Sequence, residues 1–176
     1  MKKIIALALA LALVMLTGCG KGGTASGGGD VKAVTISLLS SPASLDPATT
    51  VDGHSMMVET QLFNMLVDSD GGNSADIKPD IATDWTVSDD GLTYTFYLRD
   101  DVYFHNGKLL TASDVVYTFE RVMAEPYTSY LAVMIDSVEA PDDTTFVAHL
   151  SYPFADFLTM IGGIYFGICC EEAITS

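Results

Sequence analysis

The chain has 176 residues, of which 49% are hydrophobic, and its 23 acidic and eight basic side chains give a formal net charge of −15. This length allows one domain or two small ones, and the hydrophobic fraction is too high for a disordered chain. The excess of acidic residues argues against nucleic-acid binding, because a phosphate backbone must be met by clustered Lys and Arg. Three cysteines are too few for a disulfide-stapled scaffold.

The N-terminal residues have the order of an export signal. Lys2 and Lys3 precede an unbroken apolar run over residues 4–16, which is shorter than the roughly 20 residues that a membrane-spanning helix needs. Residues 16–19 read LTGC, which resembles the bacterial lipobox, and the resemblance implies a lipid on the thiol of Cys19. A plain secretory signal with an incidental cysteine, or a buried helix, is the alternative interpretation.

Three segments follow from this interpretation. Residues 1–18 are expected to be a lipoprotein signal peptide, and residues 19–29 form a Gly- and Ser-rich tether that cannot bury apolar area. Residues 30–176 are then the globular part. A lipid anchor, a tether and a globular domain predict a protein of the cell envelope, held at a membrane and facing the periplasm or the cell exterior.

The first third of the globular part alternates between expected regular elements and loops. Apolar residues at every second position predict a strand over residues 31–39, and the Pro- and Ser-rich segment 40–50 predicts a loop. Apolar residues at helical spacing predict a helix over residues 53–66. A polar, Gly-rich loop is expected over residues 68–79.

Two turns are predicted where a glycine follows an Asp or an Asn. Asp90-Gly91 separates strand-like residues 84–87 and 92–98, which indicates a β-hairpin. Residues 102–104 continue in extended conformation up to a second turn at Asn106-Gly107.

The remaining residues predict further helices and strands. Thr111 and Asp114 have the spacing of a capping box, so a helix is expected from there to about Met123 with an apolar face. A second hairpin is expected over residues 137–150, and a short helix over residues 154–161. An apolar, strand-like run covers residues 164–170. The fold class is therefore mixed α and β.

The sequence offers little catalytic chemistry. His54, His105 and His149 are not spaced as metal ligands, and adjacent Cys169 and Cys170 lie in an apolar run that is typical of core residues. No Ser or Cys lies in a recognisable nucleophile elbow, and no Gly-rich phosphate loop is present. We therefore expect no enzyme activity, no metal and no cofactor.

One long block resembles a known family. Residues 84–122 read DWTVSDDGLTYTFYLRDDVYFHNGKLLTASDVVYTFERV, which is similar to the signature region of the extracellular solute-binding proteins of family 5. Residues 44–47 (SLDP), 77–85 (IKPDIATDW) and 151–157 (SYPFADF) resemble flanking stretches of the same family. This family comprises dipeptide-, oligopeptide- and nickel-binding proteins of ABC importers, which are often lipoproteins.

The resemblance implies a fold and a mechanism. The expected fold is part of a type II periplasmic binding protein, mainly its extra lobe and the start of its first lobe. Because members of the family are about three times longer, we expect an N-terminal fragment that does not bind solute alone. The hydrophobic segment 161–170 would then be left uncovered. In the family, a peptide or similar small solute binds between two lobes, hinge closure buries it, and the closed form docks on a membrane permease.

The same resemblance suggests where solute contacts would lie. They are expected near the first loop, at the following residues: Ser40, Ser41, Thr50, Val51, Asp52 and Gly53. A surface loop without ligand is the alternative interpretation of these positions. A monomer is expected.

A second class of function remains open. A stand-alone small envelope lipoprotein that scaffolds or binds another protein would fold cooperatively and expose no apolar edge. An envelope hydrolase would need a nucleophile with a base in reach, for which the sequence gives no motif.

Overall fold

The computed structural model of the protein describes residues 35–69 and 76–175. The chain divides into two units, residues 1–37 and 38–176, and all the elements named below belong to the second unit. The expected signal peptide, the tether and Cys19 lie outside the described residues. None of the helices in the described part of the chain is long and apolar enough to cross a membrane.

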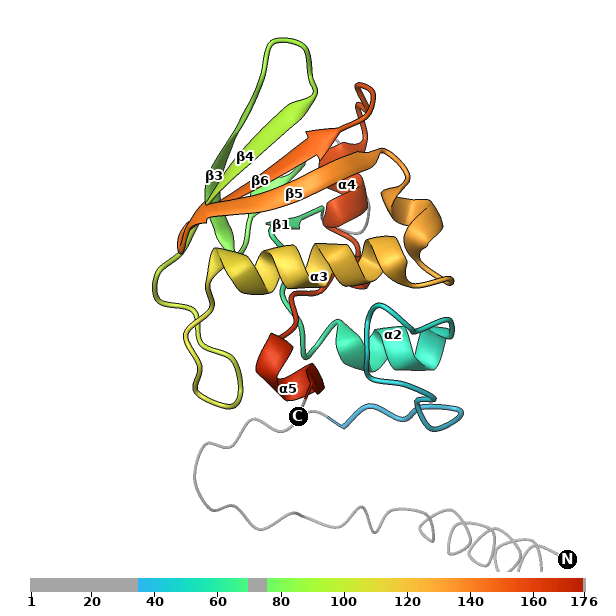
Figure 1. The fold of residues 1–176 in the computed structure, drawn as a ribbon. Coiled ribbons are helices and arrows are strands. Elements are labelled where there is room, and N and C mark those ends of the chain that lie inside the picture. The colour runs from blue at the N-terminus through green and yellow to red at the C-terminus, as the bar shows by residue number, and fades with distance from the viewer. Residues whose placement is uncertain (1–34, 70–75, 176) are drawn as a thin grey trace, which may run out of the picture. The chain divides into compact units, whose positions relative to one another are not determined.

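A four-stranded antiparallel sheet in the order β3-β4-β6-β5 is the largest element (Figure 1). Its strands are β3 (Ala82–Val87), β4 (Thr93–Leu98), β5 (Ile135–Asp142) and β6 (Thr145–Leu150). All four strands expected in this part of the sequence are confirmed, and β3 and β5 are longer than expected. The two hairpins β3–β4 and β5–β6 are joined through the central pair β4–β6.

The register of the sheet is regular in its centre and irregular at its edges. The β4–β6 pair runs without a shift from Thr93 opposite His149 to Tyr97 opposite Thr145. Both edge pairs contain register shifts, one beside Ala82 in β3 and two within β5. Irregularities of this kind bend an edge strand and increase its twist.

Two glycines make the predicted turns possible. Gly91 has φ of +69° between β3 and β4, and Gly107 has φ of +86° in a turn closed by the bridge between Tyr103 and Leu109. Glycine adopts positive φ without the steric cost that other residues incur. Both expected turns are confirmed.

Helix α3 (Ala112–Ala124) packs against β5 and β6 and lies between the sheet and α2 (Figure 1). The expected capping box is confirmed, because the Asp114 carboxylate accepts a hydrogen bond from the Thr111 amide at 3.1 Å. The same buried carboxylate accepts one from Lys108 Nζ at 2.6 Å. An acceptor at this position satisfies an amide that the helix itself leaves without a partner.

The core is dominated by aromatic rings. The most deeply buried large side chains are phenylalanines, namely Phe96, Phe119, Phe146, Phe157 and Phe166. The Phe119 ring of α3 lies 4.7 Å from the Phe146 ring of β6 and 5.0 Å from the Phe166 ring near the C-terminus. One helix residue therefore joins the sheet to the C-terminal segment.

Two expectations for the N-terminal part are wrong. Residues 35–39 form no strand, and residues 31–34 lie outside the described residues. No strand in the described part of the chain pairs with 35–39, and an isolated strand cannot satisfy its backbone groups. The expected helix over 53–66 ends early, because α2 spans only Gly53–Glu59.

The residues after α2 leave the helix in order to reach the core. Strand β1 (Val67–Asp68) pairs with β2 (Lys78–Pro79). The segment 68–79, expected to be a loop, therefore begins and ends in short strands. The Ala82 amide donates to the Leu66 carbonyl at 2.9 Å. If the helix continued through residue 66, the backbone contacts of Leu66 with Ala82 and of Val67 with Pro79 could not form, and these two buried side chains would leave the core.

The C-terminal part consists of short helical segments. These are η2 (Ser129–Ala132), α4 (Phe157–Ile161), η3 (Ile164–Phe166) and α5 (Glu171–Thr175). The short helix expected over 154–161 starts three residues later than expected.

The expectations for residues 161–170 are wrong in two respects. The segment forms η3 and irregular backbone rather than a strand, because the Ile168 amide donates to the Asn64 carbonyl at 2.9 Å and the Cys169 amide to Thr118 Oγ1 at 3.0 Å. The segment is also largely buried rather than uncovered, with Ile161, Phe166 and Ile168 all in the core. Helix α3 packs against η3 of this segment through the contact of Phe119 with Phe166.

Candidate functional site

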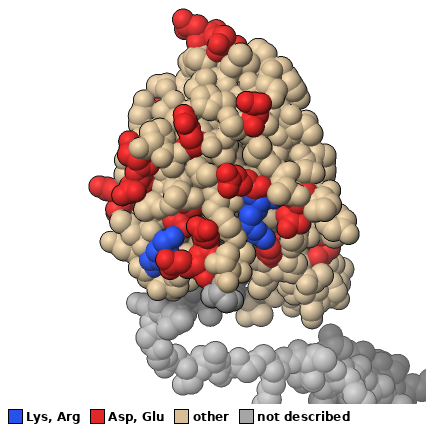
Figure 2. Space-filling view, viewed as in Figure 1, with Lys and Arg blue, Asp and Glu red and all other residues tan. Residues whose placement is uncertain are grey.

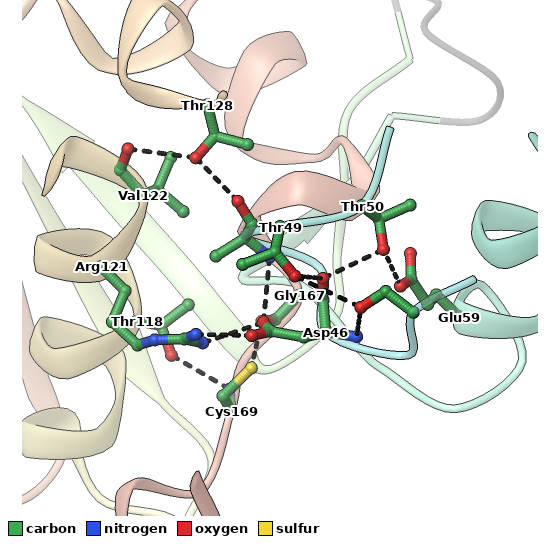
Figure 3. Close-up of polar contacts among 12 residues, drawn as sticks. Asp46, Thr49, Thr50, Glu59, Thr118, Arg121, Val122, Thr128, Gly167 and Cys169 are labelled. Atoms are coloured by element: carbon green, nitrogen blue, oxygen red, sulfur yellow. Dashed lines mark hydrogen bonds and ion pairs between the residues drawn. The ribbon is translucent and has the colours of Figure 1, made fainter. Parts of the chain in front are cut away.

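The first loop is held to helix α3 by a two-pronged ion pair. Arg121 Nη1 and Nη2 donate to Asp46 Oδ1 and Oδ2 at 3.0 and 2.6 Å (Figure 3). The Arg121 side chain is only 16% exposed and the Asp46 side chain 26%. The bond to Asp46 raises the pKa of the Arg121 guanidinium above its ordinary value. A planar guanidinium that meets both carboxylate oxygens fixes orientation as well as distance.

The backbone of the loop folds around the same aspartate. The Asp46 carbonyl accepts hydrogen bonds from the amides of Thr49 and Thr50 at 3.0 and 3.1 Å. Thr128, which is fully buried, donates its hydroxyl to the Ala48 carbonyl at 3.1 Å. The segment that follows α3 therefore lies against the first loop, as Figure 3 shows.

Asp52 begins helix α2. Its carboxylate accepts hydrogen bonds from the amides of His54 and Ser55 at 3.1 and 3.0 Å, and from the Ser55 hydroxyl at 2.6 Å. These bonds, led by that of the Ser55 hydroxyl, lower the pKa of Asp52. Ser55 Oγ also accepts from the amide of Ala43 at 2.9 Å. The N-cap thus ties both ends of the first loop together.

The six predicted solute contacts lie on this loop, but they differ in their surroundings. Thr50 is buried and Asp52 serves as the cap, whereas the other four are exposed on the loop: Ser40, Ser41, Val51 and Gly53. The hydroxyl of Ser40 lies 3.1 Å from His54 Nδ1, which brings the start of the loop to its end. Their role in binding stays a prediction.

Exposed aromatic side chains continue this surface beyond the loop. Tyr127 and Tyr130 are exposed by more than 60%, and they flank Thr128, which binds the first loop. Tyr165 OH lies 4.0 Å from Met56 Sδ of α2. We call the exposed residues of the first loop together with Tyr127 and Tyr130 the loop face.

Sequence reasoning missed the residues that hold the loop face in place. These anchoring residues are Asp46, Glu59, Arg121 and Thr128. Arg121 and Asp46 are separated by 75 positions, so no local pattern indicates their pairing. Glu59 carried no local signal either, because its burial with Ser55 on one face of α2 is visible only in the structure.

A separate cavity of about 470 Å³ is lined by other residues. Its walls include Phe63, Phe104 and Ile168. None of the six predicted solute contacts lines it. Its volume suits a small molecule, but it shares no lining residue with the loop face.

The described residues provide no evident metal or nucleophile site. No group of three or more His, Cys, Asp or Glu side chains in this part of the chain could hold a metal ion. Cys169 and Cys170 are buried free thiols, as their apolar surroundings in the sequence predicted. Burial raises the pKa of the Cys169 thiol to about 11, so this residue is a poor nucleophile near neutral pH.

The surface charge reflects the acidic composition. In the view of Figure 2, acidic side chains are scattered over the face, and the few basic groups lie beside acidic ones. Lys108 and Arg121 are both engaged in ion pairs. A polyanion would find little complementary charge on this face.

Comparison with known proteins places this fold in a family. Residues 76–169 match the sequence model of a family described as bacterial extracellular solute-binding proteins, family 5, middle. The chain belongs to this family. The resemblance found in residues 84–122 is thereby confirmed, and the family is one that binds solutes.

Several relatives in the family are similar in sequence. Heme-binding protein A of Haemophilus influenzae is 36% identical over 152 residues, which cover 74% of this chain and 28% of that protein. The probable D,D-dipeptide-binding periplasmic protein DdpA of Escherichia coli is 36% identical over 135 residues, covering 71% and 25%.

Solved structures of the family share the fold. The periplasmic binding protein DppA of Helicobacter pylori, in complex with the peptide STSA, gives a TM-score of 0.67 at 33% identity over 74% of this chain and 29% of that one. HbpA2 of Haemophilus parasuis gives 0.66 at 30% identity, covering 76% and 30%. The mixed α and β fold is therefore that of part of a periplasmic binding protein. The chain spans less than a third of the length of these family members.

Proposed function

We propose that the chain is part of the substrate-binding component of an ABC importer, which captures peptides or similar small solutes for transport across the membrane. The observation that carries this proposal is the match of residues 76–169 to the solute-binding family. It is supported by the shared fold with DppA of Helicobacter pylori, which was solved with a bound peptide. The mechanism is binding and release without covalent chemistry.

The loop face supplies the solute contacts in this proposal. Val51 and Gly53 are exposed and lie directly after the anchored residue Thr50. The ion pair of Arg121 with Asp46 keeps the loop in one conformation before solute arrives. A pre-ordered loop lowers the entropy that binding would otherwise have to overcome. Exposed Ser40 and Ser41 offer hydroxyl groups to a peptide backbone.

Solute capture is tested on the longest polypeptide that the native reading frame encodes around this sequence. Calorimetric titration with mixed di- and oligopeptides is expected to show micromolar or tighter binding, and Val51→Asp is expected to weaken it without lowering the thermal midpoint. Val87→Asp, at an exposed valine of β3, is the matched control and leaves affinity unchanged. No binding of any peptide, or equal loss in both variants, would overturn the proposal.

We also propose that Cys19 carries a lipid that anchors the protein at the cell envelope, where it meets a membrane permease. Support comes from the order of basic residues, apolar run and LTGC motif at the N-terminus. Metabolic labelling with radioactive palmitate is expected to mark the wild-type chain and not Cys19→Ala. Equal labelling of Cys169→Ala and wild type serves as the control for label on another thiol.

A second candidate function is a stand-alone envelope lipoprotein that binds a protein partner. It is favoured by one observation, namely that residues 161–170 are buried rather than exposed. Urea unfolding of the 176-residue chain measures whether it folds cooperatively, and light scattering measures whether it is a monomer. Together with the peptide titration, these measurements distinguish the partner-binding lipoprotein from the solute-binding component. A cooperative monomer that binds no peptide, in a frame that encodes nothing longer, supports the second function and contradicts the first.

A further inference from the structure

Glu59 is a buried acid that has no basic partner in residues 35–69 and 76–175. It is the last residue of α2 and its side chain is completely shielded from solvent. Its Oε1 lies in hydrogen-bond contact with Thr50 Oγ1 (Figure 3), and its Oε2 has no hydrogen-bond partner among the described residues. A buried carboxylate in such surroundings is costly, because it has lost water without gaining a cation.

The hydrogen atoms around Thr50 indicate how this acid is accommodated. Thr50 Oγ1 also contacts the Asp46 carbonyl at 3.0 Å, and a carbonyl can only accept. A hydroxyl has one hydrogen to donate, so it cannot donate to the carbonyl and to Glu59 together. Both contacts are hydrogen bonds at once only when Glu59 is a carboxylic acid and donates to Thr50.

The charges that face Glu59 favour the same state. Burial is the main cause that raises the pKa of Glu59, the hydrogen bond with Thr50 lowers it, and the charges of Asp46 and Asp52 raise it further. Arg121 is the basic group of this region, and its guanidinium is committed to Asp46. The other titratable groups that face Glu59 are Tyr165 on η3 and Cys169 in the segment that follows it.

We propose that Glu59 is a proton-dependent latch, which as a neutral acid holds Thr50 and thereby positions Val51 and Gly53, the exposed residues that follow it on the loop face. When Glu59 ionises, the Asp46 carbonyl and the Glu59 carboxylate compete for the single hydroxyl hydrogen of Thr50. The Glu59 charge is then buried without a cation. The loop is therefore held tightly at acidic pH and less tightly as the pH rises. The consequence for solute binding rests on the proposed function, whereas the latch itself does not.

The protonation state is measured directly by the ¹³C chemical shift of the Glu59 carboxyl carbon in the full chain, as a function of pH. We expect a titration midpoint above the value of about 4.3 that is usual for glutamate. A midpoint at or below that value would show that Glu59 is ionised like an exposed glutamate and would overturn the latch. Glu59→Gln identifies the resonance.

Stability separates the latch from ordinary packing. The proton binds the folded state more tightly than the unfolded state, so wild type loses stability as the pH rises from the unfolded to the folded midpoint. Glu59→Gln keeps an uncharged donor and acceptor and is expected to lack this loss. The folding equilibrium of wild type should fall relative to Glu59→Gln by about tenfold for each unit between the two midpoints. Glu120→Gln, on the exposed side of α3, is the matched control and leaves the pH dependence of wild type unchanged.

Hydrogen exchange tests the positioning of the loop. After correction for intrinsic rates, the hydrogen-bonded amides of Thr50, His54 and Ser55 should exchange faster at high pH in wild type but not in Glu59→Gln. Thr50→Val should exchange fast at all pH values. An identical pH response of wild type and Glu59→Gln would overturn the proposal.

The effect of the latch on solute binding is tested by measuring peptide affinity as a function of pH. The measurement uses the longest polypeptide that the native reading frame encodes around this sequence. If wild type weakens with pH and Glu59→Gln does not, the latch governs capture, whereas equal behaviour overturns that consequence. If no peptide binds, the proposed function fails, and the carboxyl titration still decides the latch.

Discussion

Arg121 in the last turn of α3 holds both carboxylate oxygens of Asp46, a residue 75 positions earlier in the chain. This pair fixes the loop face to the helix that also packs on the sheet. The position of the predicted solute contacts is thus set by an ion pair whose members are not among them.

Removal of one partner of this pair should destabilise the protein. Arg121→Met leaves the partly buried Asp46 carboxylate without its two charged donors, and we expect a loss of about 2 kcal/mol in the free energy of unfolding. Urea denaturation measures it. The exposed pair of Arg99 with Asp101 supplies the control, since Arg99→Met should leave the urea midpoint unchanged. Equal effects of the two substitutions would contradict this interpretation.

Thr128 should matter through its hydroxyl alone. Thr128→Val keeps the shape of the side chain but removes the hydroxyl hydrogen that is donated to the Ala48 carbonyl at 3.1 Å, with the Val122 carbonyl at 3.3 Å as the alternative acceptor. We expect a loss of about 1 to 2 kcal/mol in stability, because buried acceptors are left unpaired. Exposed Thr86 gives the matched control, and Thr86→Val should be neutral or slightly stabilising in thermal unfolding.

Two glycines should respond to alanine with opposite signs. Gly107 has φ of +86°, and Gly107→Ala should cost about 1 kcal/mol because a Cβ is disfavoured there. Gly53 opens α2 with negative φ, and a Cβ added there would meet no atom within 4 Å. Gly53→Ala should therefore stabilise by roughly 0.5 kcal/mol through the unfolded state. Chemical denaturation of both variants is the measurement, and the same sign in both would count against it.

The buried thiol of Cys169 should be inert in the folded protein. With its pKa raised to about 11, Cys169 has only about one thousandth of its molecules as thiolate at pH 8. Residue-resolved mass spectrometry after brief treatment with N-ethylmaleimide should find Cys169 unmodified, and should find it fully modified after unfolding in urea. Rapid labelling of folded Cys169 would show that the C-terminal segment opens readily.

The features that were predictable from sequence are those determined by near neighbours. The turn at Gly91, the turn at Gly107 and the capping box of Thr111 with Asp114 each depend on residues a few positions apart, and all three are confirmed. The features that were predicted wrongly depend on partners that are distant in sequence. Residues 164–170 are as apolar as a strand, but the Asn64 carbonyl and Thr118 hydroxyl take up their amides.

The candidate site shows the same division. The family resemblance, rather than any pattern of chemistry, pointed to the loop with Val51 and Asp52, whose role in binding stays a prediction. The residues that anchor this loop were missed, because Asp46 and Glu59 look like ordinary acids in the sequence. Only their burial against Arg121 and Thr50 distinguishes them.

The irregular edges of the sheet have a consequence for behaviour at high concentration. Strands β3 and β5 are the two edges, and each contains register shifts that the central pair lacks. Strand β5 also carries Asp136, Glu139 and Pro141 with exposed side chains. A bent, acidic strand with a proline is a poor template for a second chain. A protein that is half hydrophobic in composition therefore presents edges that resist strand-to-strand aggregation.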